Sequence, residues 1–259
     1  MSLLRMGARP RSQCKPKYTG CFTGNGVMVC VALSVAASYM KVCKRHDPQL
    51  NECIVNSIET LRPYLLKGIP ELDVPSIEPL TLPEVLVAQG AGIKAVGKNI
   101  VISGPGSFVI KKLNVDLANY QVDISVDLPS LTFRGDYEVS GRLLVLPLKG
   151  KGPVRANATD CKGDVVLYAE LVNKPSGDYL HFRDIDMKIT IAGYHVRLDN
   201  LFNGDRFLGE ATNAALNENP RELIAYLKPV VEKTVKNIIQ KIANQITQHF
   251  TIQELLPEN

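Results

Sequence analysis

The sequence predicts an α+β fold in which an antiparallel β-sheet covers one long C-terminal helix. The chain has 259 residues, 45% apolar and 22% charged, so it can bury a large core. In its middle, apolar and polar residues alternate, as in strands with one dry face. Near the C-terminus, apolar residues instead recur every three or four positions, as on one side of a helix. Each element needs the other to bury its apolar side.

Residues 1–38 are interpreted as a secretory signal peptide, with Met28 as an alternative start, and residues 39–259 as the mature domain. The apolar stretch 27–37 follows a basic flank and precedes a polar sequence. As a helix it would span only about 16 Å, too short for a membrane core of about 30 Å. A buried N-terminal helix is the competing interpretation. The basic flank holds Arg5, Arg9, Arg11, Lys15 and Lys17. These cations exceed the chain's net charge of +4, so the remainder is slightly acidic and offers no basic domain to nucleic acid.

Three cysteines remain if the leader is removed: Cys43, Cys53 and Cys161. Secretion favours a disulfide between Cys43 and Cys53, which leaves Cys161 unpaired. No CxxC motif or nearby histidine cluster favours a metal site. Asn157 begins an Asn-Ala-Thr acceptor for N-glycosylation, which agrees with secretion.

The first predicted helix begins at Asp47 and Pro48 and continues to Gly68. Its apolar stripe consists of Leu50, Ile54, Ile58, Leu61 and Leu65. Pro63 should bend it.

The next segment, residues 67–85, contains four prolines but keeps apolar residues between them. Prolines suit an extended edge that donates no ladder hydrogen bonds. We therefore expect this segment to run extended along a sheet edge, with its apolar side chains facing the interior. These side chains are Leu72, Val74, Ile77 and Leu80.

Strands are predicted over residues 113–117, 120–128 and 183–191, where apolar and polar residues alternate. Turns are expected at residues 149–152, the sequence KGKG, and at residues 175–177, the sequence PSG. The spacing implies an antiparallel sheet.

The last helix is predicted from Asn219-Pro220-Arg221-Glu222, a capping sequence with a first-turn proline, and lasts about thirty residues. Pro229 should curve it. Residues 199–219 are interpreted as a polar loop that packs two aromatic side chains, Phe202 and Phe207.

The sequence contains no motif that indicates an enzyme. Residues 90–95 fit a loose dinucleotide pattern, but the flanking residues read as strands, and later glycines would break the helix that the motif requires. There is no GxSxG motif, and His181 and His195 fall on predicted wet strand faces. The alternating carboxylates read as a solvated sheet face; they are Asp123, Asp127, Asp184 and Asp186. We expect no catalysis, cofactor or metal.

Three blocks of sequence resemble the insect Takeout and juvenile-hormone-binding-protein family, in its Takeout-like branch. They are CKRHDPQLNECIVNSIETLRPYLLKGIPELDVPSIEPL, NVDL and NLFNGDRFLGEATNAALNEN. The resemblance implies a strongly curved antiparallel sheet wrapped around a long helix, enclosing an elongated apolar tunnel, with relatives among lipid-transfer and bactericidal permeability proteins. It also implies the Cys43–Cys53 disulfide. Pro220 stands where many relatives have Trp, and Cys161 alone cannot supply the hormone-binding branch's second disulfide.

The resemblance implies a secreted haemolymph carrier that binds a small hydrophobic ligand, with delivery by contact with a receptor or a membrane surface but without stable membrane insertion. The ligand would be a juvenile-hormone-like terpenoid, a fatty acyl chain or another lipid, and links to circadian rhythm follow from the same resemblance. The expected lining residues are Leu72, Val74, Ile77, Leu80, Phe133, Tyr137, Tyr194, Phe202, Phe207, Leu227 and Val231. Tyr137, Tyr194 and Asn200 are candidates for contacting a polar end group. A secreted interaction or signalling module with a solid core is the alternative function, and an esterase is a more distant one.

Overall fold

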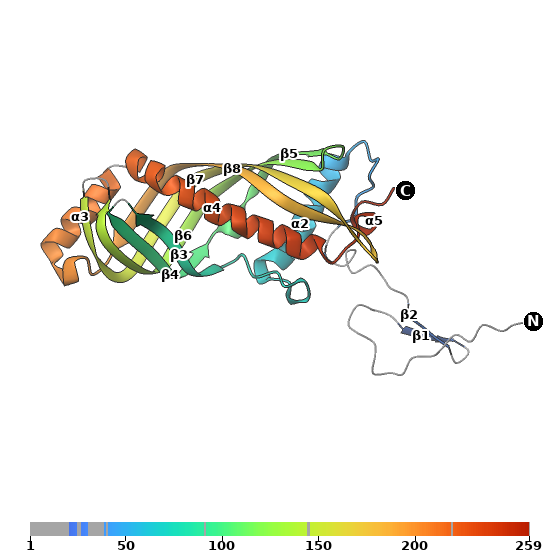
Figure 1. Cartoon of the computed structure of the whole chain (residues 1–259), viewed down its shortest axis with the longest axis horizontal. Coiled ribbons are helices and arrows are strands. Elements are labelled where there is room, and N and C mark those ends of the chain that lie inside the picture. The colour runs from blue at the N-terminus through green and yellow to red at the C-terminus, as the bar shows by residue number, and fades with distance from the viewer. Residues whose placement is uncertain are drawn as a thin grey trace, which may run out of the picture.

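The computed structural model describes residues 21–24, 27–30, 39, 41–90, 92–143, 146–218 and 220–258. It shows an elongated molecule in which helix α4 runs along one face of a large curved sheet, with α3 at one end and α2 at the other (Figure 1). Strands β1 (Cys21–Gly24) and β2 (Val27–Cys30) pair only with each other. Most of the predicted signal peptide lies outside the described residues, so the boundary after residue 38 stays a prediction.

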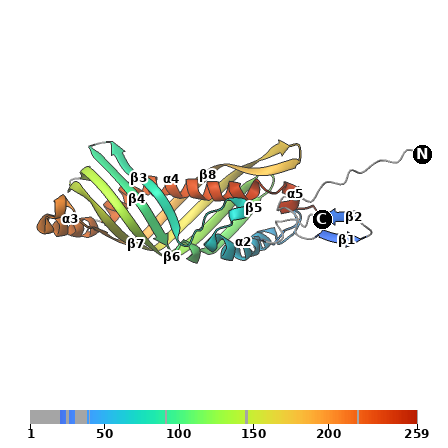
Figure 2. The same ribbon diagram turned by 90° about the horizontal axis from the view of Figure 1, so that it is seen from below.

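The sheet is antiparallel, as predicted, and its strand order is β3-β4-β6-β7-β8, with β5 also pairing with β6. Its curvature is visible from below (Figure 2). The strands are β3 (Leu80–Gly90), β4 (Ile93–Ser103), β5 (Val109–Asp116), β6 (Gln121–Leu143), β7 (Leu146–Lys174) and β8 (Gly177–Leu198). The β3–β4 connection leads into a strand, not into the helix that a dinucleotide motif requires.

Strand β7 runs through residues for which the sequence predicts a turn, so the expected KGKG turn is wrong. Residues 149–152 lie inside β7 and pair with β6. Gly150 and Gly152 allow the chain after β8 to approach β7 closely. A Cβ atom on Gly150 would lie 3.0 Å from Leu201 Cα, and a Cβ atom on Gly152 would lie 2.5 Å from the Asp199 carbonyl oxygen. The turn expected at residues 175–177 is confirmed, since β7 ends at Lys174.

The apolar face shifts by one residue at the same level of β6, β7 and β8. Leu128, Cys161 and Ile191 pair on one side of this level, and the next apolar row starts three residues away on each strand, at Leu131, Ala158 and Tyr194. Each of the three strands has one additional residue at this level. The pairing between the strands therefore continues in register, and the same face of the sheet stays apolar on both sides of the level. Such irregularities bend strands and tolerate proline, which accounts for Pro129 in the central strand β6.

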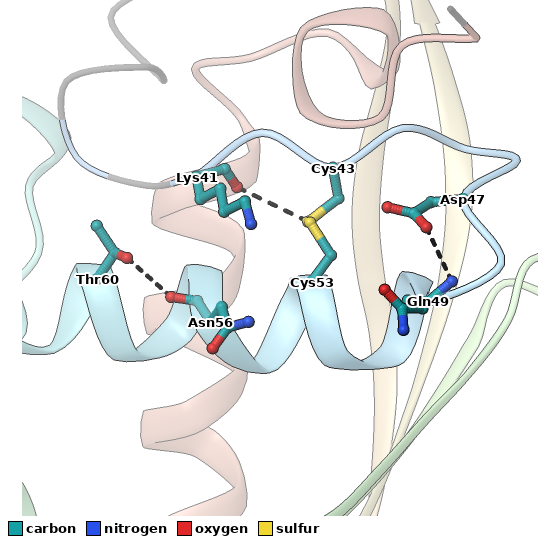
Figure 3. Close-up of a disulfide and its surroundings, with 7 residues drawn as sticks. All are labelled: Lys41, Cys43, Asp47, Gln49, Cys53, Asn56 and Thr60. Carbon is teal, nitrogen blue, oxygen red and sulfur yellow. Dashed lines mark hydrogen bonds between the residues drawn. A yellow bond between two sulfur atoms is a disulfide. The ribbon is translucent and has the colours of Figure 1, made fainter.

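Helix α2 (Leu50–Lys67) begins two residues later than predicted. Its N-cap is Gln49, whose backbone N–H donates to Asp47 Oδ1 at 2.8 Å. The disulfide between Cys43 and Cys53 joins the preceding segment to the first turns of this helix (Figure 3). Pro63 lies within the helix without interrupting it.

The proline segment forms a strand only at its end, from Leu80 on. Residues Pro70–Leu72 form a short 3₁₀ turn, η2, closed by a bridge between Ile69 and Val74. The expectation of an extended wall is wrong here because Pro70 suits the first position of the turn and Asp73 adopts a left-handed conformation that ends it. The end of the segment belongs to β3, an edge strand, where Pro83 costs no interior ladder bond.

The C-terminal part contains η4 (Phe202–Gly204), α3 (Arg206–Glu218), α4 (Pro220–Thr247) and α5 (Ile252–Leu255). The long helix α4 is confirmed, although the cap residue Asn219 lies outside the described residues. The loop expected over residues 199–219 is wrong: it is mostly α3, whose first turn is capped by Asp205 Oδ1 accepting from the Leu208 N–H at 2.9 Å.

Side chains of α3 and α4 hydrogen-bond to the free edge of β8. Asn244 accepts from the Phe182 N–H at 2.7 Å and donates to the Phe182 carbonyl at 2.9 Å. Asn213 and Asn217 make the same paired contacts with Leu198 and Val196. Gln240 and Glu232 add contacts to Arg183 and Ile189, at 2.9 and 2.8 Å. These bonds satisfy an edge that would otherwise expose unpaired backbone groups.

We expect Asn244→Leu to destabilise the fold by about 1–3 kcal/mol, because it leaves the N–H of buried Phe182 without a partner and removes one of the two donors to its carbonyl. Urea unfolding measures the change. The matched control is Asn237→Leu, an exposed position on the same helix, which should change stability by less than about 0.5 kcal/mol. Equal effects of the two substitutions would show that the edge contacts contribute nothing specific.

Candidate functional site

One row of side chains crosses the inner face of the sheet from edge to edge. The strand register aligns Leu80, Ile102, Phe133, Ala156 and Val196 on five adjacent strands. All five are apolar and all five are only half-buried. Two of the predicted lining residues, Leu80 and Phe133, therefore lie on the same inward face.

The buried side chains form three separate clusters. The α3-end cluster contains Ile93, Tyr137, Val139, Leu143, Leu148, Leu201, Leu216 and Leu223, against which Tyr194, Phe202 and Leu227 pack. The α2-end cluster contains Leu61, Leu65, Ile69, Leu72, Val74 and Phe250, with Ile77 packed against it. The β7–β8 cluster contains Val165, Leu167, Ala169, Phe182 and Ile185. Predicted lining residues thus lie in two clusters at opposite ends of the molecule.

Between these clusters, α4 and the sheet bury their apolar side chains incompletely. Of the described residues of α4, only Leu223 and Thr247, near its two ends, are fully buried, whereas Val231 and Val235 in its middle are half-buried. On its apolar face, the middle of β7 carries small residues: Ala156 is half-buried, whereas Ala158, Cys161 and Gly163 are buried. A close-packed core would also bury Val231 and Val235 of α4 and Ala156 of β7 completely. The middle of the molecule therefore holds less side-chain volume than its ends.

The polar groups at the α3 end are already engaged. The Tyr137 hydroxyl donates to the Asp199 carbonyl at 2.7 Å, and burial together with the Asp199 charge raises the Tyr137 pKa to about 12. The Tyr194 hydroxyl donates to the Leu216 carbonyl, and burial raises its pKa. Asn200 donates to the Lys151 carbonyl at 2.9 Å. The three groups expected to select a ligand's polar end instead fasten the chain after β8 to the sheet.

A polar pocket of about 230 Å³ lies outside this face, between the end of β8 and the start of α3. Its charged walls pair with each other: Arg197 bonds Asp199 at 3.0 Å and Glu210 at 2.7 Å. This pairing lowers the pKa of the Glu210 carboxyl. The salt bridges in this pocket therefore connect α3 to the sheet.

Phe207 does not line an interior surface. It lies in the first turn of α3 and is 82% exposed, since this helix buries asparagines against β8 and turns Phe207 outward. Asn157 is exposed on the outer face of β7, and His181 and His195 are exposed on β8. Cys161 is a buried free thiol whose pKa is raised, mainly by burial.

Among the described residues, no three His, Cys, Asp or Glu side chains group as metal ligands. Within the same part of the chain, no helix has the length and apolarity to cross a bilayer.

A curved sheet that wraps a long helix, with an apolar inner face left loosely filled, defines a class of hydrophobic-ligand-binding folds. The chain belongs to the haemolymph juvenile hormone binding protein family, whose family model matches residues 26–257.

Its similarity to individual members is moderate. It is 26% identical over 228 residues to the circadian clock-controlled protein daywake of Drosophila melanogaster, covering 84% of this chain and 86% of the relative. It is 23% identical over 213 residues to a putative beta-carotene-binding protein of Schistocerca gregaria, covering 82% and 85%. Its fold matches crystalline Takeout 1 of Epiphyas postvittana with a TM-score of 0.74 at 21% identity, over 83% of this chain and 99% of that one.

We expect Tyr137→Phe to lower stability by about 1 kcal/mol at pH 8, since it removes a hydrogen bond to a backbone carbonyl. Folding raises the pKa of this phenol above its ordinary value near 10, so its contribution is complete below about pH 10 and is lost as the pH rises toward 12. The difference between wild type and variant should therefore shrink above pH 10. Urea unfolding at pH 8 and pH 11 measures it, with Tyr120→Phe, at an exposed tyrosine, as control. A difference that persists unchanged at pH 11 would contradict the interpretation.

Proposed function

We propose that the protein is a secreted carrier that binds a small hydrophobic ligand in a chamber between the inner face of the sheet and α4. The observation that carries the proposal is the low side-chain volume in the middle of the molecule: Val231 and Val235 of α4 are half-buried, and the apolar face of β7 carries the small residues Ala156, Ala158, Cys161 and Gly163. Ligand sites in proteins are concave and mostly apolar. Binding would be an equilibrium without bond making.

The magnitudes suit such a role. A ligand that buries about 300 Å² of its own apolar surface gains roughly 7 kcal/mol before the costs of binding. After these costs, micromolar capture is the expected range.

The comparisons support a hydrophobic ligand without naming it. The family model is named for binding a haemolymph hormone, and one relative is named for binding beta-carotene. For this chain we propose a terpenoid, fatty acyl or similar lipid. Family membership also supports secretion, and we propose that delivery takes place at a receptor or a membrane surface.

A substitution at Ala156 distinguishes the hypothesis of a ligand chamber from that of a solid core. In a chamber, Ala156→Leu adds volume where space exists, so ligand affinity should fall at least tenfold while stability is unchanged or increased. In a solid core, the same change would overpack the interior and destabilise the fold by about 1–3 kcal/mol. Uptake of N-phenyl-1-naphthylamine measures binding, and urea unfolding measures stability. The control is His195→Leu, on the outer face of β8 next to Val196, which should leave affinity unchanged.

The ligand itself is accessible by purification from insect cells, native mass spectrometry and organic extraction. A stoichiometric apolar molecule would identify the ligand class. An empty, stable protein that takes up no long-chain probe would favour an interaction module instead.

We expect the secreted protein to carry an N-glycan at Asn157, because this acceptor asparagine is exposed on the outer face of β7. Peptide N-glycosidase F should therefore increase the protein's electrophoretic mobility, and Asn157→Gln should abolish that increase. A treated wild type that migrates like the untreated one would refute the site.

A further inference from the structure

We propose that the α3 end of the molecule binds anionic lipid membranes, with Phe207 inserted among the lipids and the basic half of the outer sheet face against their headgroups. This inference rests on the proposed function, in which the carrier delivers its ligand at a surface. It names the part of the chain that makes the contact and the kind of surface that it contacts.

Among the described residues, the most exposed large apolar side chain is that of Phe207, in the first turn of α3. Its exposed fraction is 82%, and that of the adjacent Leu208 is 46%. Helix α3 lies at one extreme end of the elongated molecule (Figure 1). An apolar pair at the tip of a long molecule is accessible to a flat surface. Such side chains gain free energy when they leave water for the boundary of a lipid bilayer.

The side of α3 that carries Phe207 continues the outer face of the sheet. Glu210 lies three residues after Phe207, so the two side chains share one side of the helix. The Glu210 carboxylate pairs with the Arg197 guanidinium at 2.7 Å. Arg197 points outward on β8, because its neighbours Val196 and Leu198 pack against the α3-end cluster on the inner face. Phe207 therefore lies beside the outer face of the sheet and not over its apolar inner face.

The half of this outer face next to α3 is basic. From the level of Arg134 to the α3 end, the outward positions of β6, β7 and β8 carry two carboxylates, of Asp136 and Glu138, and six cations. Two of the cations pair with Asp199, and the other four form no ion pair with the described residues. The paired cations are Arg155 and Arg197, and the others are Arg134, Arg142, Lys149 and Lys151.

The other half of the outer face has the opposite charge. Residues 121–127, 162–168 and 184–190 of the same three strands carry two outward cations, Lys162 and Lys188, and five outward carboxylates. The carboxylates are those of Asp123, Asp127, Asp164, Asp184 and Asp186. An anionic surface attracts the basic half and repels the acidic one, so it orients the molecule with α3 toward the lipid.

An anionic membrane fits both features of the α3 end, whereas other partners fit only one. A soluble polyanion would bind the cations, but it offers no apolar phase to Phe207. A second copy of the chain could cover Phe207, but it would bring two basic faces together. An anionic bilayer presents negative headgroups at its surface and apolar chains beneath them.

Insertion of residue 207 can be measured directly, because the chain contains no tryptophan. We expect Phe207→Trp in the full mature chain to shift its emission to the blue when phosphatidylcholine vesicles with about one third phosphatidylserine are added. Brominated lipids in the same vesicles should quench this emission. Tyr120→Trp, at an exposed tyrosine next to the acidic half, is the matched control and should show neither effect. An emission of Phe207→Trp that these vesicles leave unchanged would overturn the proposal.

Co-sedimentation with the same vesicles tests the apolar and the basic component separately. Phe207→Ser should weaken binding at least about fivefold, and Lys149→Glu combined with Lys151→Glu at least about tenfold. The matched control combines Lys162→Glu with Lys188→Glu, which changes the net charge equally in the acidic half and should leave binding within about twofold. Equal weakening by the two double variants, or equal binding to pure phosphatidylcholine, would contradict a basic membrane-binding site at the α3 end.

Uptake of N-phenyl-1-naphthylamine keeps membrane binding separate from carriage. Phe207→Ser should take up the probe like the wild type, because Phe207 lies on the surface. A wild-type chain that takes up the probe but does not bind anionic vesicles would overturn the membrane-binding site and leave carriage intact. Vesicle binding without uptake would refute carriage and support the site. Analytical ultracentrifugation tests self-association: a wild-type dimer that Phe207→Ser dissociates would assign Phe207 to a second copy and overturn the proposal.

Discussion

The structure depends on the hydrogen bonds that α3 and α4 make to the free edge of β8. A helix cannot extend a sheet with its own backbone, because its N–H and C=O groups are used internally. Here asparagine, glutamine and glutamate side chains supply the missing partners, with Gln240 and Asn244 one helical turn apart on α4. The position of α4 is thereby set along an edge and does not require close packing across the middle. An interior left partly unfilled can persist because the helix is fixed from the side.

The opposite edge of the sheet is held differently. On β3, Ala88 packs against the α3-end cluster, which includes Leu223 of α4. Over the described residues, no hydrogen bond joins β3 to α4, in contrast to β8. Pro83 and a register irregularity near Leu86 further reduce what β3 could offer as a hydrogen-bonding edge. The sheet thus closes on its helix with polar bonds at one edge and apolar contact at the other.

The parts of the fold that the sequence could predict are those governed by local periodicity. The stripe of α4 and the alternation in β6 and β8 follow from neighbouring residues. The middle of β7 could not be found this way, because Gly150 and Gly152 look like turn residues and are explained only by a chain segment about fifty positions away. Because this part of β7 was not predicted, its small inward residues, which support the proposed chamber, were not recognised from the sequence.

Helix α3 was missed for a related reason. Its buried face contains Asn213 and Asn217, which pattern analysis counts as polar loop residues. Asn213 is buried and Asn217 is half-buried because their partners are backbone groups of β8. Phe207 was misassigned for the converse reason: an aromatic side chain was expected inside, but the face that packs on β8 was already occupied by amides.

The distribution of packing has a thermodynamic consequence. An unfilled interior forfeits dispersion contacts and destabilises a protein in proportion to the space left. In this molecule the loss is confined to the middle, while the clusters at both ends, the Cys43–Cys53 disulfide and the β8 edge bonds stabilise the frame. A ligand that fills the middle restores those contacts and shifts the folding equilibrium further toward the native state. The proposed carriage would therefore be coupled to stability through the middle of the molecule.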